Sequence, residues 1–256
     1  MRKILYIFLF LLPFQFTVFA AKPFRFALFT DLHISVYNPQ NAEDLKLAVN
    51  DVNADDKIEF VLITGDVSDL GDTTSLKIAK DLLYGLKIPY YITSGNHDTK
   101  PDEIGSANFI RVFGADKFSF ISNDYQFLGF PTGPEKGGNI GHIDAEDFNF
   151  VKSVLDKNKP TFIITHYPLL KGDLDNYMGM TDLLKKYNVK AVLNGHYHRN
   201  VLLNYDGIPG IVNRSTLRAT QKVGGYSIYL ISDSLKVSEK IIGLPERIWL
   251  ALPLQN

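Results

Sequence analysis

The sequence predicts an α/β domain in which a largely parallel sheet packs against a second, mostly antiparallel sheet. Short apolar runs rich in β-branched and aromatic residues alternate with stretches of helical periodicity over the first two thirds of the chain. Each run ends abruptly in a polar cluster. The last third instead contains closely spaced runs joined by short Gly- or Asp-containing turns. With 256 residues, 45% of them hydrophobic, the chain suffices for one domain with a large core.

Five strands of the parallel sheet are expected to end at polar clusters. They span residues 24–29, 60–63, 90–93, 161–164 and 191–193, and the clusters that follow contain Asp31, Asp66, Asn96, His166 and His196. Helices are expected between them, one after a possible cap at Asn41, one around residues 76–86 and one after a possible cap at Asp144. Ligands bind at the carboxyl ends of parallel strands, so the clusters should share one face. Strands at 200–205, 210–212, 225–231 and 235–242 are assigned to the second sheet.

The first twenty residues have the pattern of an export signal. Arg2 and Lys3 precede an apolar run over residues 4–19, and Val18 and Ala20 stand where a signal peptidase requires small residues. The prediction is a cleaved signal over residues 1–20 and a mature domain over 21–256, periplasmic or secreted and without a membrane partner. An uncleaved membrane anchor is the alternative, although the run is shorter than the ~20 residues that a spanning helix needs and contains Pro13.

Net charge and cysteine content restrict the chemistry. A formal charge of −1 provides no basic field for nucleic acid, so no specific nucleic-acid partner is expected, and an anionic substrate must be attracted locally. The chain has no cysteine, which excludes disulfides and thiolate ligands.

The histidines indicate a metal site. Five of the six histidines lie within a few residues of a predicted strand end, and only His142 does not. Taken singly, each could be an ordinary surface or core histidine, but together with Asp31, Asp66 and Asn96 they provide mixed nitrogen and oxygen donors. Such donors suit Mn, Fe or Zn, and the absence of thiolate argues against a structural zinc site.

Five motifs in order resemble the calcineurin-like metallophosphoesterase family: Asp31-Leu32-His33, Gly65-Asp66, Gly95-Asn96-His97-Asp98, His166 and Gly195-His196-Tyr197-His198. The resemblance implies a four-layer α/β/β/α sandwich with two mixed β-sheets. It also implies two divalent or trivalent metal ions, one held by Asp31, His33, Asp66 and His198, the other by Asp66, Asn96, His166 and His196. Asp66 would then bridge the ions, and a hydroxide shared by them would attack phosphorus in line.

The resemblance and the residue types also suggest substrate contacts. His97 is expected to protonate the leaving oxygen or to stabilise charge on the phosphoryl group, with a supporting hydrogen bond to the metal site as the alternative. Asp98 is expected to orient His97, and Asn96 and His97 to contact substrate. Arg214 and Arg218 are candidates for binding phosphate, and equally for solvated charges.

Two departures from the family pattern narrow the choice of branch within the family. Asp69 stands where the purple acid phosphatases have a tyrosine, and no nucleotide-recognition domain of the exported nucleotidases follows residue 198. The chain is therefore most similar to the small single-domain branch that includes the class III cyclic-nucleotide phosphodiesterases. Hydrolysis of a phosphodiester in a small phosphorylated substrate is expected. A phosphomonoesterase on the same site and a non-catalytic, metal-bound binding protein are the alternatives.

Overall fold

A computed structural model describes residues 22–99, 106–134, 140–218 and 222–254. The predicted export signal at residues 1–20 lies outside the described residues. Within the described ranges, no helix has the length and apolarity needed to cross a membrane.

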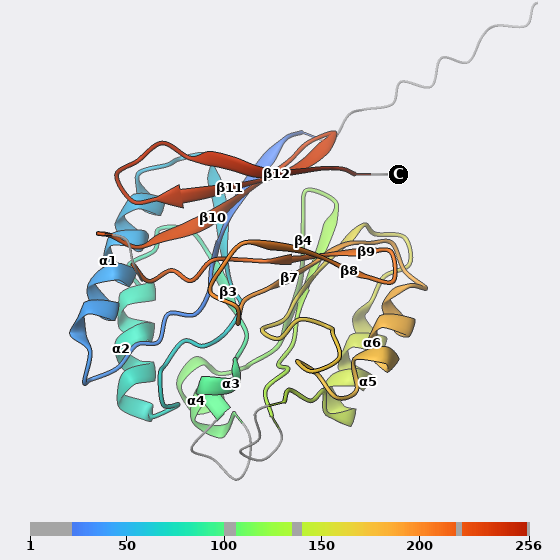
Figure 1. The fold of residues 1–256 in the computed structure, drawn as a ribbon, viewed down its shortest axis with the longest axis horizontal. Helices are drawn as coiled ribbons and strands as arrows, with labels where there is room; N and C mark the ends of the chain where they lie inside the picture. Colours follow the sequence, from blue (N-terminus) through green and yellow to red (C-terminus); the bar gives the residue numbers. More distant parts are fainter. Residues whose placement is uncertain (1–21, 100–105, 135–139, 219–221, 255–256) are drawn as a thin grey trace, which may run out of the picture.

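The first sheet has six strands in the order β12-β11-β10-β1-β2-β3 (Figure 1). Its parallel half consists of β1 (Phe24–Phe29), β2 (Ile58–Ile63) and β3 (Tyr90–Ile92). Its antiparallel half consists of β10 (Gly225–Ile231), β11 (Ser234–Ile241) and β12 (Arg247–Pro253). The start and the end of the domain therefore share one sheet.

The second sheet also has six strands, in the order β4-β5-β6-β7-β9-β8. Four run parallel: β5 (Tyr125–Gly129), β6 (Thr161–Ile164), β7 (Val189–Asn194) and β9 (Ile208–Val212). The antiparallel strands β4 (Phe118–Ser122) and β8 (Val201–Tyr205) form its two edges. Both sheets are thus mixed.

The expected division into one largely parallel and one mostly antiparallel sheet is wrong. The hairpin of β8 and β9 joins the second sheet, and the hairpin of β10 and β11 joins the first. Short turns specify which neighbouring strands pair, but they carry no information about the sheet to which a hairpin is added. The five strands with polar ends are divided as well, three in the first sheet and two in the second.

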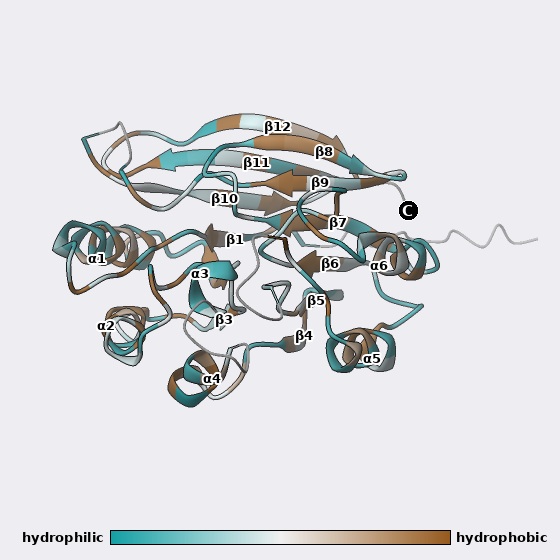
Figure 2. Cartoon of the chain, turned by 60° about the horizontal axis from the view of Figure 1, so that its bottom comes forward, coloured by the Kyte–Doolittle hydropathy of each residue, from teal (hydrophilic) through white to brown (hydrophobic). Residues whose placement is uncertain are grey.

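Helices cover the outer face of each sheet, which confirms the four layers. The helices α1 (Pro39–Asn53), α2 (Thr73–Leu83) and α4 (Ala107–Phe113) lie on the side of the first sheet, and α5 (Ala145–Val154) and α6 (Tyr177–Leu184) on the side of the second (Figure 1). Figure 2 shows hydrophobic strands such as β6 and β9 inside these layers. The single turn α3 (Asn96–Thr99) lies near the junction of the sheets.

The helix start predicted at Asn41 is wrong, and the start predicted at Asp144 is confirmed in position. Helix α1 begins at Pro39, whose fixed φ suits a first turn, so Asn41 lies inside the helix. The Nδ2 of Asn41 donates to the backbone oxygen of His33 at 2.7 Å, which ties the helix to the loop after β1. Asp144 does precede α5, but without a side-chain capping bond.

An aromatic core joins the two sheets. Phe26 stacks on Phe60 and on Tyr229 with ring centroids 5.1 and 4.8 Å apart, and its ring meets Phe127 edge-on at 5.4 Å. Each ring is fully or nearly fully buried, and burial of one such side chain contributes about 1.5–3 kcal/mol. This core holds the two sheets in one fixed arrangement and so fixes where their strand ends meet.

Candidate metal centre

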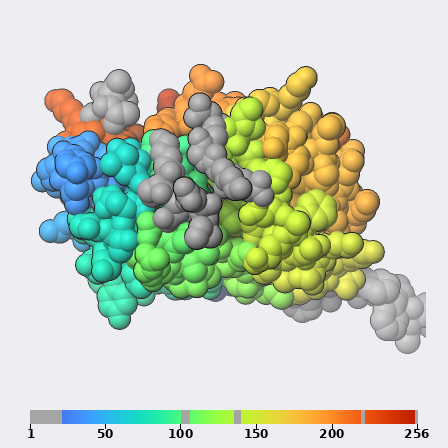
Figure 3. All heavy atoms as spheres, turned by 90° about the horizontal axis from the view of Figure 1, so that it is seen from below, coloured from blue at the N-terminus to red at the C-terminus, as the bar shows by residue number. Residues whose placement is uncertain are grey.

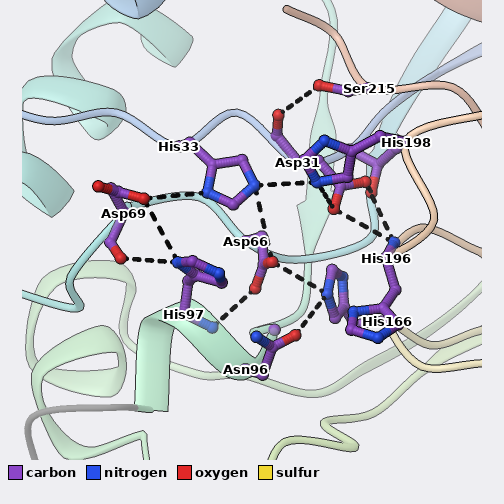
Figure 4. Close-up of polar contacts among 12 residues, drawn as sticks. Asp31, His33, Asp66, Asp69, Asn96, His97, His166, His196, His198 and Ser215 are labelled. Atoms are coloured by element: carbon purple, nitrogen blue, oxygen red, sulfur yellow. Dashed lines mark hydrogen bonds and ion pairs between the residues drawn. The ribbon is translucent and has the colours of Figure 1, made fainter. Parts of the chain in front are cut away.

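The polar clusters converge where the carboxyl ends of the two sheets meet. Figure 3 views the molecule from below, the side on which Figure 1 draws α3 and α4, and there blue and teal segments of the first half lie across from yellow and orange segments of the second. Figure 4 shows the converging side chains. The first sheet contributes Asp31, His33, Asp66, Asn96 and His97, and the second contributes His166, His196 and His198.

One group of potential metal ligands combines Asp31, His33 and His198. The Nε2 of His198 lies 3.1 Å from Oδ1 of Asp31 and 3.2 Å from Nε2 of His33. Burial opposes ionisation of Asp31, but the hydrogen bond from His198 and the charges of His166 and His198 together outweigh it, and the pKa of Asp31 is lowered. Burial also lowers the pKa of His33, which favours the neutral imidazole that binds metal.

A further group combines Asp66, His166 and His196. The Nε2 of His166 lies 3.2 Å from Oδ2 of Asp66 and 3.0 Å from Oδ1 of Asn96. Burial lowers the pKa of His196 to about 4, so its imidazole is neutral near pH 7. Asn96 thus joins this group as an uncharged oxygen donor.

Asp66 lies between the two groups. Its Oδ2 is 3.2 Å from Nε2 of His166 and 3.8 Å from Nε2 of His33. Asp66 also forms a group with His33 and His97 that could hold an ion. The carboxylate therefore has the position expected of a ligand shared by two ions (Figure 4).

The hydrogen bonds around His166 indicate that a cation belongs here. Nδ1 faces the backbone oxygen of Thr64 at 2.9 Å, so this nitrogen carries the proton. Nε2 of the neutral ring is then an acceptor that faces two further acceptors, on Asp66 and Asn96. Without metal this conflict requires a second proton: burial lowers the pKa of His166, but Asp66 outweighs burial and raises it to about 9. A metal ion supplies the same positive charge.

Strained backbone holds many of these side chains. Five candidate ligands have positive φ, a conformation that non-glycine residues rarely adopt and that costs on the order of 1–3 kcal/mol each. They are Asp31 at 52°, His33 at 42°, Asp66 at 49°, His196 at 71° and His198 at 55°. Concentration of such strain in the loops after β1, β2 and β7 is typical of a functional site.

Two glycines allow the loops to approach each other. A Cβ at Gly95 would overlap Oδ1 and the backbone nitrogen of Asp66, and a Cβ at Gly195 would overlap Oγ1 of Thr30 and Oδ2 of Asp31. The glycine of each motif is therefore required by close packing against a ligand carboxylate.

The hydrogen bonds of Asp98 indicate a role in joining two loops, beside the predicted one of orienting His97. The buried carboxylate of Asp98 accepts hydrogen bonds from the backbone nitrogens of Val67, Ser68 and Gly95 at 2.8–3.1 Å, and from the Ser68 hydroxyl at 3.0 Å. Burial raises the pKa of Asp98 to about 6. Asp98 ties together the loops that carry Asp66 and Asn96, and this explains its place in the motif.

His97 contacts Asp69. Its Nδ1 lies 2.7 Å from the backbone oxygen of Asp69 and 3.4 Å from Oδ1 of the same residue, while its backbone nitrogen donates to Oδ1 of Asp66 at 2.8 Å. Sequence reasoning noticed Asp69 only as a departure from another branch. The signal that could have revealed the contact with His97 is the position of Asp69 three residues after Asp66, in the same strand-end loop.

The structure gives both candidate arginines protein partners. Arg218 donates from Nε and Nη2 to Oδ1 of the buried Asp44 at 2.8 and 2.5 Å. Arg214 is 8% exposed, donates to the backbone oxygen of Leu217 and lies 3.7 Å from Glu239. These contacts favour structural roles over phosphate binding. His142, which sequence reasoning left unassigned, pairs with Asp175 at 2.8 Å.

This fold and this set of ligands define a metallophosphoesterase. The chain belongs to the calcineurin-like phosphoesterase family, whose sequence pattern matches residues 24–200. Members of this family bind two metal ions, and the overlapping groups of potential ligands found here provide donors for more than one ion.

Relatives of known description are distant. A probable cyclic nucleotide phosphodiesterase of Rhodopseudomonas palustris is 32% identical over 218 residues, 74% of this chain and 77% of the relative. Another of Coxiella burnetii is 24% identical over 237 residues, 84% of this chain and 89% of the relative. A probable glycerophosphodiester phosphodiesterase of Arcobacter nitrofigilis is 27% identical over 190 residues, 66% of this chain but only 64% of the relative.

Solved structures share the fold at low identity. A purple acid phosphatase from yellow lupin has a TM-score of 0.63 at 14% identity, covering 91% of this chain and 53% of that chain. GAP50 of Plasmodium, described as the anchor in the inner membrane complex, has a TM-score of 0.59 at 11% identity and coverages of 91% and 90%. These similarities confirm the architecture.

Proposed function

We propose that this protein is an exported, dinuclear metal-dependent phosphodiesterase. The observation that carries the proposal is the position of Asp66 between two groups of metal ligands at the junction of the sheets. A single-ion site would not need a carboxylate within reach of both groups.

The residues fit the two ions proposed for them. Three acceptors converge at His166, and two imidazole nitrogens face each other at His33 and His198, contacts that a cation would make favourable. The mixture of imidazole, carboxylate and amide donors suits Mn, Fe or Zn. When bound, two ions clamp phosphate oxygens and lower the pKa of an attacking water.

Residues beside the metal ligands could protonate the leaving group. Water oxygen forms a bond to phosphorus, the bond to the alcohol oxygen breaks, and that oxygen needs a proton. Because Nδ1 of His97 faces the backbone oxygen of Asp69, Nε2 is the nitrogen that can deliver the proton. Asn96 begins α3, so His97 directly follows a candidate ligand.

The names of the relatives support a diester as substrate. Probable cyclic nucleotide and glycerophosphodiester phosphodiesterases are both described as cleaving phosphodiesters. A monoester is the second candidate, favoured by the 26% identity to a zebrafish serine/threonine-protein phosphatase over 204 residues. A non-catalytic, metal-bound binding protein is the third candidate, because a fold alone does not establish turnover.

An assay with two chromogenic esters tests the proposal. The purified domain, loaded with Mn²⁺, is expected to hydrolyse bis-p-nitrophenyl phosphate with a higher kcat/KM than p-nitrophenyl phosphate. The reverse order would favour the monoesterase. No metal-dependent turnover of either ester, with two ions bound, would support the binding protein.

Export has a separate test. Full-length protein expressed in a bacterium is expected in the periplasm or medium, with Ala21 as its first residue, because Arg2, Lys3 and the apolar run form a signal. Recovery of the intact chain in the membrane fraction would support the anchor instead.

A further inference from the structure

Tyr197 separates two candidate ligands that belong to different groups. His196 is part of the group around Asp66, and His198 is part of the group around Asp31. Both histidines have positive φ, at 71° and 55°, so the turn that carries them is strained. Such a conformation persists only where surrounding contacts determine it. The contacts of Tyr197 therefore bear on ligands for both ions.

The side chain of Tyr197 is held at its hydroxyl and at its ring. The hydroxyl donates to Oδ2 of Asp173 at 2.5 Å. Arg199 lies over the ring, with Cζ 5.8 Å from the ring centroid. A hydrogen bond from a hydroxyl to a carboxylate is shorter and stronger than one between neutral groups. Asp173 thus holds the middle of the turn through a single strong contact.

This contact differs from the other anchor of the turn. The backbone nitrogen of His196 lies 3.2 Å from both carboxylate oxygens of Asp31, which is itself a candidate metal ligand. Among the residues that the structure describes, Asp173 belongs to none of the groups of potential metal ligands. Its hydrogen bond with Tyr197 can therefore hold the turn in the same way before and after metal binds.

The position of Asp173 follows from packing in the loop between β6 and α6. Its backbone oxygen accepts from the nitrogen of Gly141 at 2.7 Å, and the neighbouring Leu174 is fully buried and forms a β-bridge with Gly141. A Cβ at Gly141 would overlap the ring of Tyr167. The ring of Tyr167 in turn packs on that of His196, with centroids 4.2 Å apart. The acceptor is thus fixed relative to the ligand that it helps to hold.

We propose that the hydrogen bond between Tyr197 and Asp173 positions His196 and His198 for the two metal ions. Both members of the pair are positioning residues. Because one turn carries a ligand for each ion, loss of this bond should weaken both sites. The inference rests on the two ions of the proposed function, but it does not require that the protein hydrolyses an ester.

The experiment begins with Tyr197→Phe, which lacks only the hydroxyl. Calorimetric titration of the metal-free protein with Mn²⁺ should show both sites weakened by about tenfold, as expected for the loss of one hydrogen bond to a charged group. The kcat for bis-p-nitrophenyl phosphate should fall at limiting Mn²⁺ and return to near the wild-type value at saturating Mn²⁺. Tyr84→Phe, at an exposed tyrosine that ends α2, is the matched control and should keep the wild-type affinity.

Variants of Asp173 separate positioning from a general loss of stability. Asp173→Asn keeps an acceptor oxygen and should bind Mn²⁺ nearly as the wild type does, whereas Asp173→Ala should match Tyr197→Phe. Because the two side chains act through one bond, Tyr197→Phe combined with Asp173→Ala should weaken binding little beyond either single change. Thermal unfolding of each metal-free variant shows whether it folds. If Tyr197→Phe does not fold, the contrast between Asp173→Asn and Asp173→Ala decides.

Wild-type affinity at either Mn²⁺ site in Tyr197→Phe would overturn the proposal, and so would additive losses in the double variant. Equal losses in Asp173→Asn and Asp173→Ala would overturn it as well. A wild type that binds two ions without hydrolysing either ester would refute the phosphodiesterase, and the binding data would still decide the role of Tyr197.

Discussion

His33 and His198 face each other through their Nε2 atoms, which lie 3.2 Å apart. One ring can donate to the other when its Nε2 carries the proton, and the same geometry lets both neutral rings face one cation. Because metal binds the folded site and not the unfolded chain, the folded protein should be markedly more stable with metal than without.

Removal of metal is therefore expected to lower the melting temperature. Addition of Mn²⁺ at about one hundred times Kd contributes about 2.7 kcal/mol per ion, which corresponds to roughly 5–10 °C for a domain of this size. Thermal unfolding after dialysis against a chelator, with and without Mn²⁺, measures the effect. Asp66→Ala provides the control. If Mn²⁺ raised the melting temperature of that variant by the same amount, the result would contradict the role of Asp66 as a ligand shared by two ions.

The metal-free protein should lose stability as pH rises from about 6.5 to about 9. The pKa of His166 is about 9 in the fold, above the ordinary value of 6.5, because Asp66 outweighs burial. The stabilisation from protonated His166 is complete below the pKa of histidine in the unfolded chain. It is lost as the pH rises past the pKa of His166 in the folded protein. Melting temperatures measured in chelator from pH 6 to pH 9.5 test this, and His166→Gln should flatten the curve. The same proton leaves when metal binds, so Mn²⁺ affinity should increase over this interval.

His97→Ala should lower kcat by about 10²–10⁴-fold and leave two ions bound, because a positioned proton donor contributes a factor of this size. Metal content is measured alongside steady-state kinetics on bis-p-nitrophenyl phosphate. His142→Ala is the matched control, since His142 pairs with Asp175 outside the groups of metal ligands. Loss of an ion in His97→Ala would identify His97 as a ligand, in line with its proximity to His33 and Asp66.

Arg218→Ala should lower the melting temperature by a few degrees and change KM less than twofold. The buried Asp44 would lose the guanidinium that contacts its Oδ1 at 2.8 Å, while the candidate metal centre would keep its ligands. Thermal unfolding and KM on the same preparation measure both effects. A large rise in KM at unchanged stability would restore the original expectation of phosphate binding.

The sequence predicted individual strands well because their boundaries are marked locally. The strands Phe24–Phe29 and Thr161–Ile164 begin and end at the predicted residues. The pairing of strands was not predictable, because β1 lies between β2 and β10, and its residues pair with residues of β10 about two hundred positions away, for which no local signal exists. The four layers followed from the family resemblance rather than from periodicity.

The candidate ligands were predictable because each stands at a recognisable strand end. The contacts that support these ligands were harder to predict from the sequence. Asp98 binds backbone nitrogens of two loops, and the carboxylate of Asp69 lies near two imidazole rings. Such roles depend on the direction of a side chain within a loop, which composition and spacing do not specify. Arg214 and Arg218 were chosen for their charge, and their partners Glu239 and Asp44 lie far away in the sequence.

The division of the ligands between two sheets has a consequence for how the protein acquires its metal. Asp66 and Asn96 belong to one sheet and His166 and His196 to the other, so a complete site exists only after the aromatic core has joined the sheets. A chain that crosses a membrane unfolded arrives without ions. Its choice among Mn, Fe and Zn would then reflect the supply of metals in the compartment where it folds, not in the compartment where it was synthesised.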